Sequence, residues 1–240
     1  MRVATLFAAV LSGALAFASF TGAASAQDYA AILAAPDRTD ADKQNDGKRQ
    51  ALPFLAFVGA KTGMKVLDMG AGAGYSSELL ARSVGESGKV HAQNPGKSEK
   101  LEARMQTPAM RNALAIVRPY DDPAPAEAGA FDMITLFFAY HDITYQEVDR
   151  ARMNKAIFAA LKPGGFYVIA DHSARPEDGA TVGKTLHRIG ESALRAEVEA
   201  AGFKLVGTGD FLRHPEDQRT AAVFRNPTPV DEFVLKFQKP

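Results

Sequence analysis

The sequence predicts an α/β fold built on a doubly wound, mostly parallel sheet. A short apolar run at 66–69 leads into glycines at every second position, and a helical pattern follows from Ser76. Two nearly continuous apolar runs, at 131–138 and 166–170, are typical of strands buried on both faces of a parallel sheet. Strand-like and helix-like segments alternate along the chain, which favours right-handed crossover connections.

The segment 66–75 combines a strand, a glycine turn and a helix start. Glycine permits unusual backbone angles and lets a ligand approach the main chain closely. The helix start offers unpaired N–H groups and a positive dipole end, so the segment is a candidate nucleotide-binding edge. A dinucleotide fingerprint would need its third glycine at Tyr75, and a P-loop would need a lysine before Ser76, so neither motif fits.

The residues Asp68, Gly70, Gly72 and Gly74 form a pattern that resembles the first motif of the class I S-adenosylmethionine-dependent methyltransferases. The phrase Leu-Lys-Pro-Gly-Gly at 161–165 is a second resemblance to that family. It implies a seven-stranded Rossmann-like sheet with an antiparallel last strand, and S-adenosylmethionine as the cofactor. In the family the turn passes under the methionine part of the cofactor, and the acid holds that region. The alternative is a turn that only makes a tight strand-to-helix corner.

The remaining elements follow at the spacing of βαβ units. We expect helices at 49–58, 99–107 and 148–161, a mostly helical segment at 181–201, and strands at 89–93, 113–117, 203–212 and 231–237. Leu52, Leu55 and Val58 are expected on one face of the first helix. In the methyltransferase order the last two strands form a hairpin, and the fourth and fifth strands lie next to the first.

Residues 1–26 have the pattern of a secretory signal peptide. Arg2 provides a positive start, an apolar run covers 3–20, and Ala24-Ser25-Ala26 is a cleavage site before Gln27. A membrane anchor is the alternative, but the small-residue end argues against it. We therefore expect an exported protein, periplasmic or secreted, with one domain at 27–240. Its leader, about 27–62, is expected to be helical. The polar part at 28–48 is expected to be solvated or to form a short amphipathic helix over the sheet, and a lid over the cofactor is the functional alternative.

Composition excludes several classes of partner and site. The chain has 28 basic and 28 acidic residues, and removal of Arg2 with the signal leaves 27 basic residues. This balance gives no electrostatic preference for nucleic acid or an anionic membrane, so we expect a small-molecule substrate and no stable membrane insertion after signal removal. Cysteine is absent, which excludes disulfides and thiolate metal sites.

Cofactor binding is expected at the ends of the first three strands. The candidate residues are Asp68, Gly70, Gly72, Gly74, Tyr75, Asn94 and Asp121. The family usually has an acid after the second strand that accepts the ribose hydroxyl protons, whereas this chain has Gln93 and Asn94 there. An amide lacks the charge assistance of a carboxylate. Asp121 follows the third strand, where an acid in the family meets the adenine amino group, although a solvated turn is as good an interpretation.

Catalytic candidates follow the fourth and fifth strands, because ligands of open α/β sheets bind beyond the carboxyl ends of the strands. They are His141, Asp171 and His172, with His187 on the next helix. A histidine can take a proton near neutral pH and so act as a general base toward a hydroxyl. The alternative for each histidine is a structural hydrogen-bonding role.

A metal site is the alternative to a histidine base at these strand ends. Asp142, Asp171 and His172 offer oxygen and nitrogen ligands for a divalent cation, and metal-dependent catechol-type methyltransferases have acids after the same two strands. Their amide directly after the second acid is missing here, so we expect no metal. No Ser lies in a G-x-S-x-G elbow, which disfavours a hydrolase triad.

The sequence thus predicts an exported methyltransferase that acts on a small-molecule acceptor. A hydroxyl is one group of the acceptor that could receive the methyl. Several short sequence motifs, among them 170–174 and 231–237, resemble those of a group of exported or predicted methyltransferases of unknown substrate. Residues 138–141 read Phe-Ala-Tyr-His instead of the family's Asn/Asp-Pro-Pro-Tyr/Phe phrase, which disfavours nucleic-acid bases and protein amides. The alternative is an exported, non-catalytic binding protein with an altered ligand, because S-adenosylmethionine is made in the cytoplasm.

Overall fold

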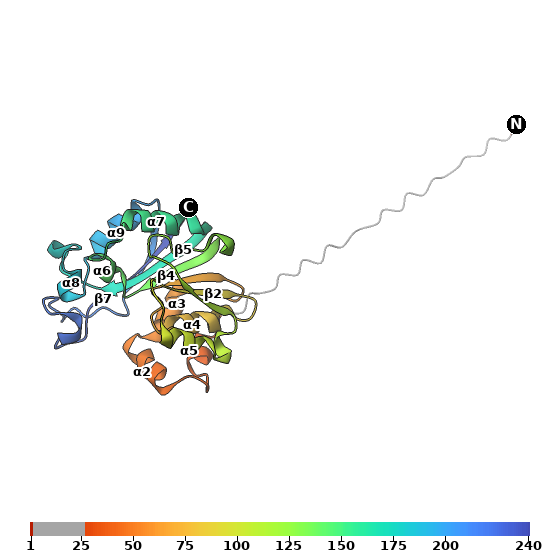
Figure 1. The fold of residues 1–240 in the computed structure, drawn as a ribbon, viewed down its shortest axis with the longest axis horizontal. Coiled ribbons are helices and arrows are strands. Elements are labelled where there is room, and N and C mark those ends of the chain that lie inside the picture. The colour runs from red at the N-terminus through yellow and green to blue at the C-terminus, as the bar shows by residue number, and fades with distance from the viewer. Residues whose placement is uncertain (2–26) are drawn as a thin grey trace.

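The computed structural model describes Met1 and residues 27–240, so the signal peptide predicted for residues 1–26 lies outside the described residues. A seven-stranded sheet forms the centre of the molecule (Figure 1). The strands are β1 Lys65–Met69, β2 Lys89–Asn94, β3 Ala113–Val117, β4 Phe131–Phe137, β5 Leu161–His172, β6 Lys204–Gly209 and β7 Glu232–Gln238. Their order is β3-β2-β1-β4-β5-β7-β6, and β7 is antiparallel to both neighbours. This confirms the predicted fold class.

The helices connect the strands and cover both faces of the sheet. They are α1 Tyr29–Leu33, α2 Asp40–Lys48, α3 Ala51–Val58, α4 Tyr75–Val84, α5 Glu99–Met105, α6 Tyr140–Ile143, α7 Arg150–Ala160, α8 Gly183–Leu186 and α9 Glu191–Glu199, with short 3-10 turns at Pro108–Met110, Ala126–Ala128, Pro176–Asp178 and Val223–Arg225. Side chains at Asp28, Thr39, Ser98 and Asp149 cap α1, α2, α5 and α7 by accepting from backbone N–H groups of the first turn. Within the described residues, no helix has both the length and the apolar character needed to cross a membrane.

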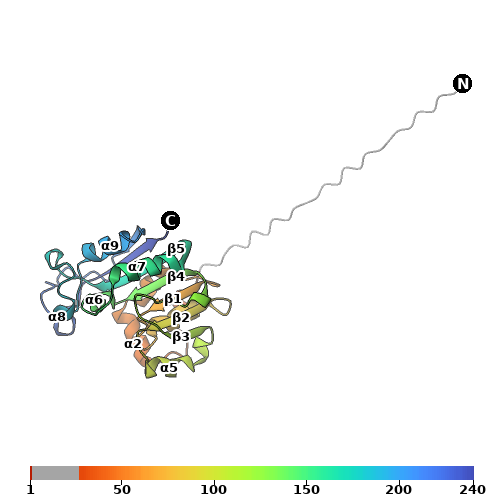
Figure 2. The same ribbon diagram turned by 45° about the horizontal axis from the view of Figure 1, so that its top comes forward.

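Apolar side chains of the strands alternate between two cores, one on each face of the sheet. In β1, Val66 packs with residues of α3 and α4, whereas Leu67 belongs to the core that includes residues of α7 and α9. Figure 2 shows α7 and α9 together along one side of the sheet. The core around Leu67 holds fully buried aliphatic and aromatic side chains, and the core around Val66 holds fully buried aliphatic ones with partly buried phenylalanines packed against them. Burial on both faces explains the continuous apolar runs of β4 and β5.

The parallel strands bring four loops to one edge of the sheet. Gly70 follows β1, Asn94 ends β2, Phe138 follows β4 and His172 ends β5, and these strands all run in the same direction. The order also corrects one expectation: β4 separates β5 from β1, so the fifth strand is not next to the first. The carboxyl edge therefore holds the glycine turn and the predicted histidine cluster on nearby strands.

Local structure differs from prediction at several points. Leu52 is 48% exposed, and Ala51 joins Leu55 and Val58 on the buried face of α3, which begins two residues later than expected. The predicted helix at 181–201 is broken into α8 and α9, because His187 adopts a left-handed conformation with φ of 54°. β5 begins at Leu161, before the Pro-Gly-Gly phrase, and β6 ends at Gly209 instead of continuing to residue 212.

The polar leader keeps most of its charged side chains in solvent, as expected, but two of them are buried. Arg38 and Asp42 are 4% and 3% exposed. Arg104 of α5 donates to both carboxylate oxygens of Asp42, at 2.9 and 3.0 Å, and to Glu78 of α4 at 2.6 Å. This ion-pair network ties α2 to α4 and α5, as the position of α2 beside them in Figure 1 shows.

Candidate functional site

The glycine turn between β1 and α4 has the backbone geometry that its sequence predicts. Gly70, Gly72 and Gly74 all have positive φ, at 62°, 58° and 86°. A Cβ atom at Gly74 would lie 2.8 Å from Cδ1 of Leu101, whereas at Gly72 it would meet no atom nearer than 4.0 Å. Gly72 therefore has an open side where a ligand can approach the main chain.

Asp68 shapes this turn from inside the protein. Its carboxylate is buried and accepts hydrogen bonds from the hydroxyls of Ser76, Ser77 and Thr135, at 2.8, 2.6 and 2.7 Å. Burial raises the pKa of Asp68, and the three hydroxyl donors partly oppose that shift. The structure thus revises its predicted role: Asp68 fixes the strand, the turn and the first turn of α4, and does not line the cavity.

Asn94 is joined to the open glycine. Its Oδ1 accepts from the N–H of Gly72 at 2.8 Å, and its Nδ2 donates to the carbonyl of Gly72 at 3.0 Å. Gln93 likewise accepts from the N–H of Gly70 at 3.1 Å. Both amides therefore hold the turn in place. Among the described residues only one hydrogen bond reaches Oδ1 of Asn94, so its second lone pair could still accept a ribose hydroxyl, without the charge of a carboxylate.

Tyr75 links the turn to the leader. Its hydroxyl donates to Oδ1 of Asp46 at 2.8 Å, and Asp46 is in turn held by Arg38 through a bond of 2.7 Å. Burial, with the adjacent Asp46 carboxylate, raises the pKa of Tyr75 above its usual value. The tyrosine ring is therefore fixed at the start of α4, where it lines a cavity.

Asp121 lies apart from the other cofactor candidates. Its carboxylate is 3.4 Å from the guanidinium of Arg152, on α7. The neighbouring Tyr120 is the residue that reaches the glycine turn, because a Cβ atom at Gly70 would lie 3.3 Å from its hydroxyl. The predicted adenine contact at Asp121 is thus not supported by its placement, and sequence reasoning missed Tyr120.

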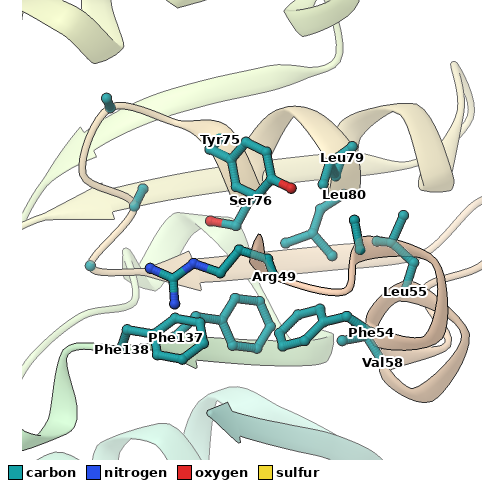
Figure 3. Close-up of a pocket in the computed structure, with 14 residues that line it drawn as sticks. Arg49, Phe54, Leu55, Val58, Tyr75, Ser76, Leu79, Leu80, Phe137 and Phe138 are labelled. Carbon is teal, nitrogen blue, oxygen red and sulfur yellow. The ribbon is translucent and has the colours of Figure 1, made fainter. Parts of the chain in front are cut away.

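A cavity of about 250 Å³ lies between the glycine turn and a hydrophobic wall. Figure 3 shows Tyr75, Ser76, Leu79 and Leu80 of α4 on one side and Phe54, Phe137 and Phe138 on the other, with Arg49 between them. The Phe54 and Phe137 rings meet edge-on at 4.8 Å. Phe138 has φ of 57°, an uncommon conformation for a large side chain, which turns the chain sharply at the end of β4.

Arg49 is the cation at the edge of this cavity. Its guanidinium lies 3.6 Å above the Phe138 ring, and Nη1 is 3.7 Å from Oε1 of Glu232. The side chain remains 37% exposed. A planar guanidinium held on an aromatic face can form paired hydrogen bonds with a carboxylate. Sequence reasoning missed Arg49 because its partners are distant in the chain.

The predicted catalytic residues converge as expected, around Asp171. This carboxylate is fully buried and accepts from Nδ1 of His141 at 2.5 Å and from the backbone N–H groups of His141 and His172, each at 2.8 Å. Burial alone would lower the pKa of His141, but the hydrogen bond and charge of Asp171, with the charge of Asp142, raise it. His141 and His172 have ring centroids 5.3 Å apart.

His172 connects this cluster to the cavity wall. Its ring centroid lies 5.1 Å from that of Phe138, which lines the cavity. Its Nδ1 is 2.8 Å from Oε1 of Glu232, yet the contact is off the N–H axis, so this buried nitrogen has no hydrogen bond to any described residue. Glu232 thus lies between Arg49 and His172 and contacts both.

His187 completes the cluster from the connection between α8 and α9. Its Nδ1 is 3.1 Å from Oδ1 of Asp142, and its ring centroid is 5.6 Å from that of His141. The structure therefore brings together all four predicted catalytic residues. Asp142 joins them, and its Oδ1 also accepts a hydrogen bond from the hydroxyl of Tyr145 at 2.8 Å.

Comparison with known proteins agrees with this geometry. The profile of the family described as "Methyltransferase domain" matches residues 66–165, from β1 to the Pro-Gly-Gly phrase. The chain is 27% identical over 176 residues to the ubiquinone/menaquinone biosynthesis C-methyltransferase UbiE of Cronobacter sakazakii, covering 70% of this chain and 66% of the relative. It is 28% identical over 117 residues to UbiE of Vibrio vulnificus strain YJ016, covering 48% of this chain and 44% of the relative. The chain thus spans about half to two thirds of these curated relatives.

Solved structures share the fold at low sequence identity. A SAM-dependent methyltransferase from Aquifex aeolicus aligns with a TM-score of 0.58 and 20% identity, over 78% of this chain and 88% of that one. The cyclase SpnF aligns with a TM-score of 0.64 and 15% identity, over 82% and 83%. The match of residues 66–165 to the methyltransferase profile, the open glycine turn and the seven-stranded sheet with its antiparallel β7 are features that this chain shares with the class I S-adenosylmethionine-dependent methyltransferases, whose cofactor is S-adenosylmethionine.

Proposed function

We propose that this protein transfers a methyl group from S-adenosylmethionine to a small acceptor that carries a hydroxyl on an aromatic ring. One observation carries the proposal: a cavity is bounded by the glycine turn on one side and by Phe137 and Phe138 on the other. A donor lying along the turn would face an acceptor stacked on the aromatic wall. Such alignment of two reactants is the main requirement of methyl transfer.

The donor side of the cavity suits the methionine part of the cofactor. Gly72 offers its open side, while Tyr75 and Ser76 line the cavity at the start of α4. Arg49 is placed to bind the methionine carboxylate. Bound S-adenosylmethionine supplies an electrophilic methyl group on a positively charged sulfur.

The acceptor side offers a base. In this proposal the imidazole of His172 takes the hydroxyl proton of the acceptor, and Glu232, 2.8 Å from its Nδ1, stabilises the imidazolium that forms. The acceptor then forms a bond to the methyl carbon, the bond between that carbon and sulfur breaks, and its electron pair stays on sulfur. S-adenosylhomocysteine and the methylated acceptor are the products.

The curated relatives bear on the atom that is methylated. Their name assigns them C-methylation in ubiquinone and menaquinone biosynthesis. A deprotonated phenol is nucleophilic at its oxygen and at the ortho ring carbons, so one aromatic acceptor accommodates both outcomes. After methylation at carbon, that ring carbon loses its hydrogen as a proton, the phenol oxygen regains a proton, and the aromatic ring is restored. We include both in the proposal, with a phenol or quinol ring as the acceptor class.

We also propose that the protein acts after export and on small molecules rather than nucleic acid. The charge balance of 28 basic and 28 acidic residues provides no field that would attract a polyanion. The residues at 1–26 supply the proposed signal.

The test is methyl transfer from labelled S-adenosylmethionine to a panel of phenols, catechols and naphthoquinols, with S-adenosylhomocysteine measured as the common product. His172→Asn should lower turnover by about 10²–10⁴-fold, as expected for loss of a general base. His214→Asn is the matched control, because His214 is a surface histidine whose partner is Glu216. Equal turnover in wild type and His172→Asn would contradict the role of His172.

A second candidate, binding without methyl transfer, has one observation in its favour. Asn94 at the end of β2 is an amide that is already bonded to Gly72, where the superfamily usually has a ribose-binding acid. Binding of S-adenosylhomocysteine with no product formed from any acceptor in the panel would support this candidate instead.

A further inference from the structure

We propose that His141, Asp142 and His187 bind a divalent transition-metal ion. Nε2 of His141 and Nδ1 of His187 each lie 3.1 Å from Oδ1 of Asp142. One ligand atom from each residue falls within 4.8 Å of the other two. Two imidazoles and a carboxylate are a common ligand set for zinc and for other first-row metals.

Two of the three distances between these ligand atoms are those of neighbouring ligands around one ion. With metal–ligand distances of about 2.1 Å, neighbouring ligand atoms lie about 3.0 Å apart in an octahedral site and about 3.4 Å apart in a tetrahedral one. The observed 3.1 Å falls in this interval for both pairs. The contact between His141 and Asp142 has no hydrogen-bond geometry, as expected of atoms directed toward a shared third atom, whereas the contact between His187 and Asp142 also has the geometry of a hydrogen bond.

Asp171 prepares His141 for this role. It accepts from Nδ1 of His141 at 2.5 Å, which leaves Nε2 as the ligand atom and fixes the ring. A carboxylate behind a metal-binding histidine is the usual outer-shell arrangement, and it orients the ring and raises ligand basicity. The oxygen of Asp171 that accepts from Nδ1 of His141 is Oδ1, which also accepts from the backbone N–H of His172, and Oδ2 accepts from the backbone N–H of His141. Asp171 is therefore a positioning residue and not a ligand. The ligand set considered from the sequence was Asp142, Asp171 and His172, of which only Asp142 is a ligand in this proposal.

The backbone is built to hold His187 beside α6. Gly183 of α8 packs so closely on α6 that a Cβ atom there would lie 2.2 Å from Oγ1 of Thr144 and 2.3 Å from the carbonyl oxygen of His141. Backbone bonds of 2.9 Å from Ile189 to His172, and from Ala174 to Ile189, tie the following segment to the end of β5. His187 keeps a left-handed φ of 54° between these two anchors.

Three protein ligands leave coordination positions for water or for an oxygen of another molecule. The side chains of Asp142 and His187 are 36% and 28% exposed, so the site is accessible from solvent. The proposal does not rest on methyl transfer, because metal binding can be measured without donor or acceptor.

The test uses the untagged chain, freed of metal with a chelator and titrated with Zn²⁺ by calorimetry, with bound metal counted after dialysis. We expect one tightly bound Zn²⁺ per chain and a higher melting temperature with Zn²⁺. His187→Asn should lower the affinity at least tenfold, and asparagine tolerates the left-handed backbone of that position. Asp171→Asn should lower it by about 10–100-fold through His141.

His214→Asn is the control, since this histidine is outside the cluster and pairs with Glu216. It should bind Zn²⁺ as the wild type does. Melting of the metal-free variants separates loss of the site from loss of the fold. A folded His187→Asn variant that binds Zn²⁺ as tightly as the wild type would overturn the proposal. It would also be overturned if His214→Asn lost as much Zn²⁺ affinity as His187→Asn.

Discussion

Substitution of Gly72 by alanine separates the binding role of the glycine turn from its folding role. Gly72 has φ of 58° and an open side, with no atom closer than 4.0 Å to the position of a Cβ. We expect the variant to fold and to lose affinity for S-adenosylhomocysteine, because the new methyl group occupies the space that the ligand needs.

The folding cost can be bounded from the backbone angle. An L-residue in the left-handed region costs about 1–2 kcal/mol, and the lower entropy of the unfolded alanine chain returns about 0.4–1 kcal/mol. The net loss of about 1 kcal/mol should lower the melting temperature by about 2–4 °C in a domain of this size. The ligand-binding loss should be at least tenfold, or about 1.4 kcal/mol.

Gly164→Ala is the matched control. Gly164 has φ of 76° and no atom within 4 Å of its Cβ position, but it lies near the start of β5, at the opposite edge of the sheet from the turn. Both variants should melt slightly below wild type, and calorimetry should show weakened S-adenosylhomocysteine binding in Gly72→Ala alone. Wild-type affinity in a folded Gly72→Ala variant would refute the placement of the ligand on this turn.

Three further predictions concern Arg49, the buried ion pair of Asp217 and the signal peptide. Arg49→Met should weaken S-adenosylhomocysteine binding by about 10–150-fold, as expected for a lost charged hydrogen bond of about 1.5–3 kcal/mol. The ligand 5′-methylthioadenosine lacks the carboxylate, so the variant should bind it as tightly as the wild type does. An equal loss for both ligands would contradict the role of Arg49. Asp217→Asn should lower the free energy of unfolding by about 3–5 kcal/mol at pH 7, because Arg188 and Asp217 form a fully buried ion pair at 2.8 Å. Burial alone would raise the pKa of Asp217, but backbone donors at Asp231 and Arg219 and the Arg188 guanidinium lower it, so its contribution is present above the usual carboxyl pKa of about 3.9 and is lost as the pH falls through the lowered folded value. The difference between the two proteins in urea unfolding should therefore shrink below about pH 4, and a difference that is constant down to pH 2 would contradict the assignment. N-terminal sequencing of exported protein should give Gln27 as the first residue, and soluble exported protein that begins at Met1 would contradict the proposed signal peptide.

Features encoded within a few neighbouring residues could be predicted from the sequence. The strand before Gly70, the positive φ of its glycines and the helix after Gly74 follow from local patterns. The parallel sheet with its antiparallel last strand followed from the family resemblance and from the handedness of parallel connections, although the fifth strand was wrongly expected next to the first. The clustering of His141 with His172 followed because both lie at the carboxyl ends of neighbouring parallel strands.

Features that depend on long-range packing could not be predicted. Arg49 reaches its position through Phe138 and Glu232, which are far away in the chain. Asp68 was expected to face the cofactor, but three hydroxyls from two other elements surround it inside the protein. The position of His187 depends on the close contact of Gly183 with α6, and no local pattern reports that contact.

The central claim is that the glycine turn and the adjoining cavity bind S-adenosylmethionine. Calorimetric titration of the wild-type chain with S-adenosylmethionine and S-adenosylhomocysteine tests it most directly. We predict one saturable site per chain for both ligands, with each ligand competing for the other's site. The absence of binding heat for both ligands up to millimolar concentration, in a chain that melts cooperatively, would contradict the claim.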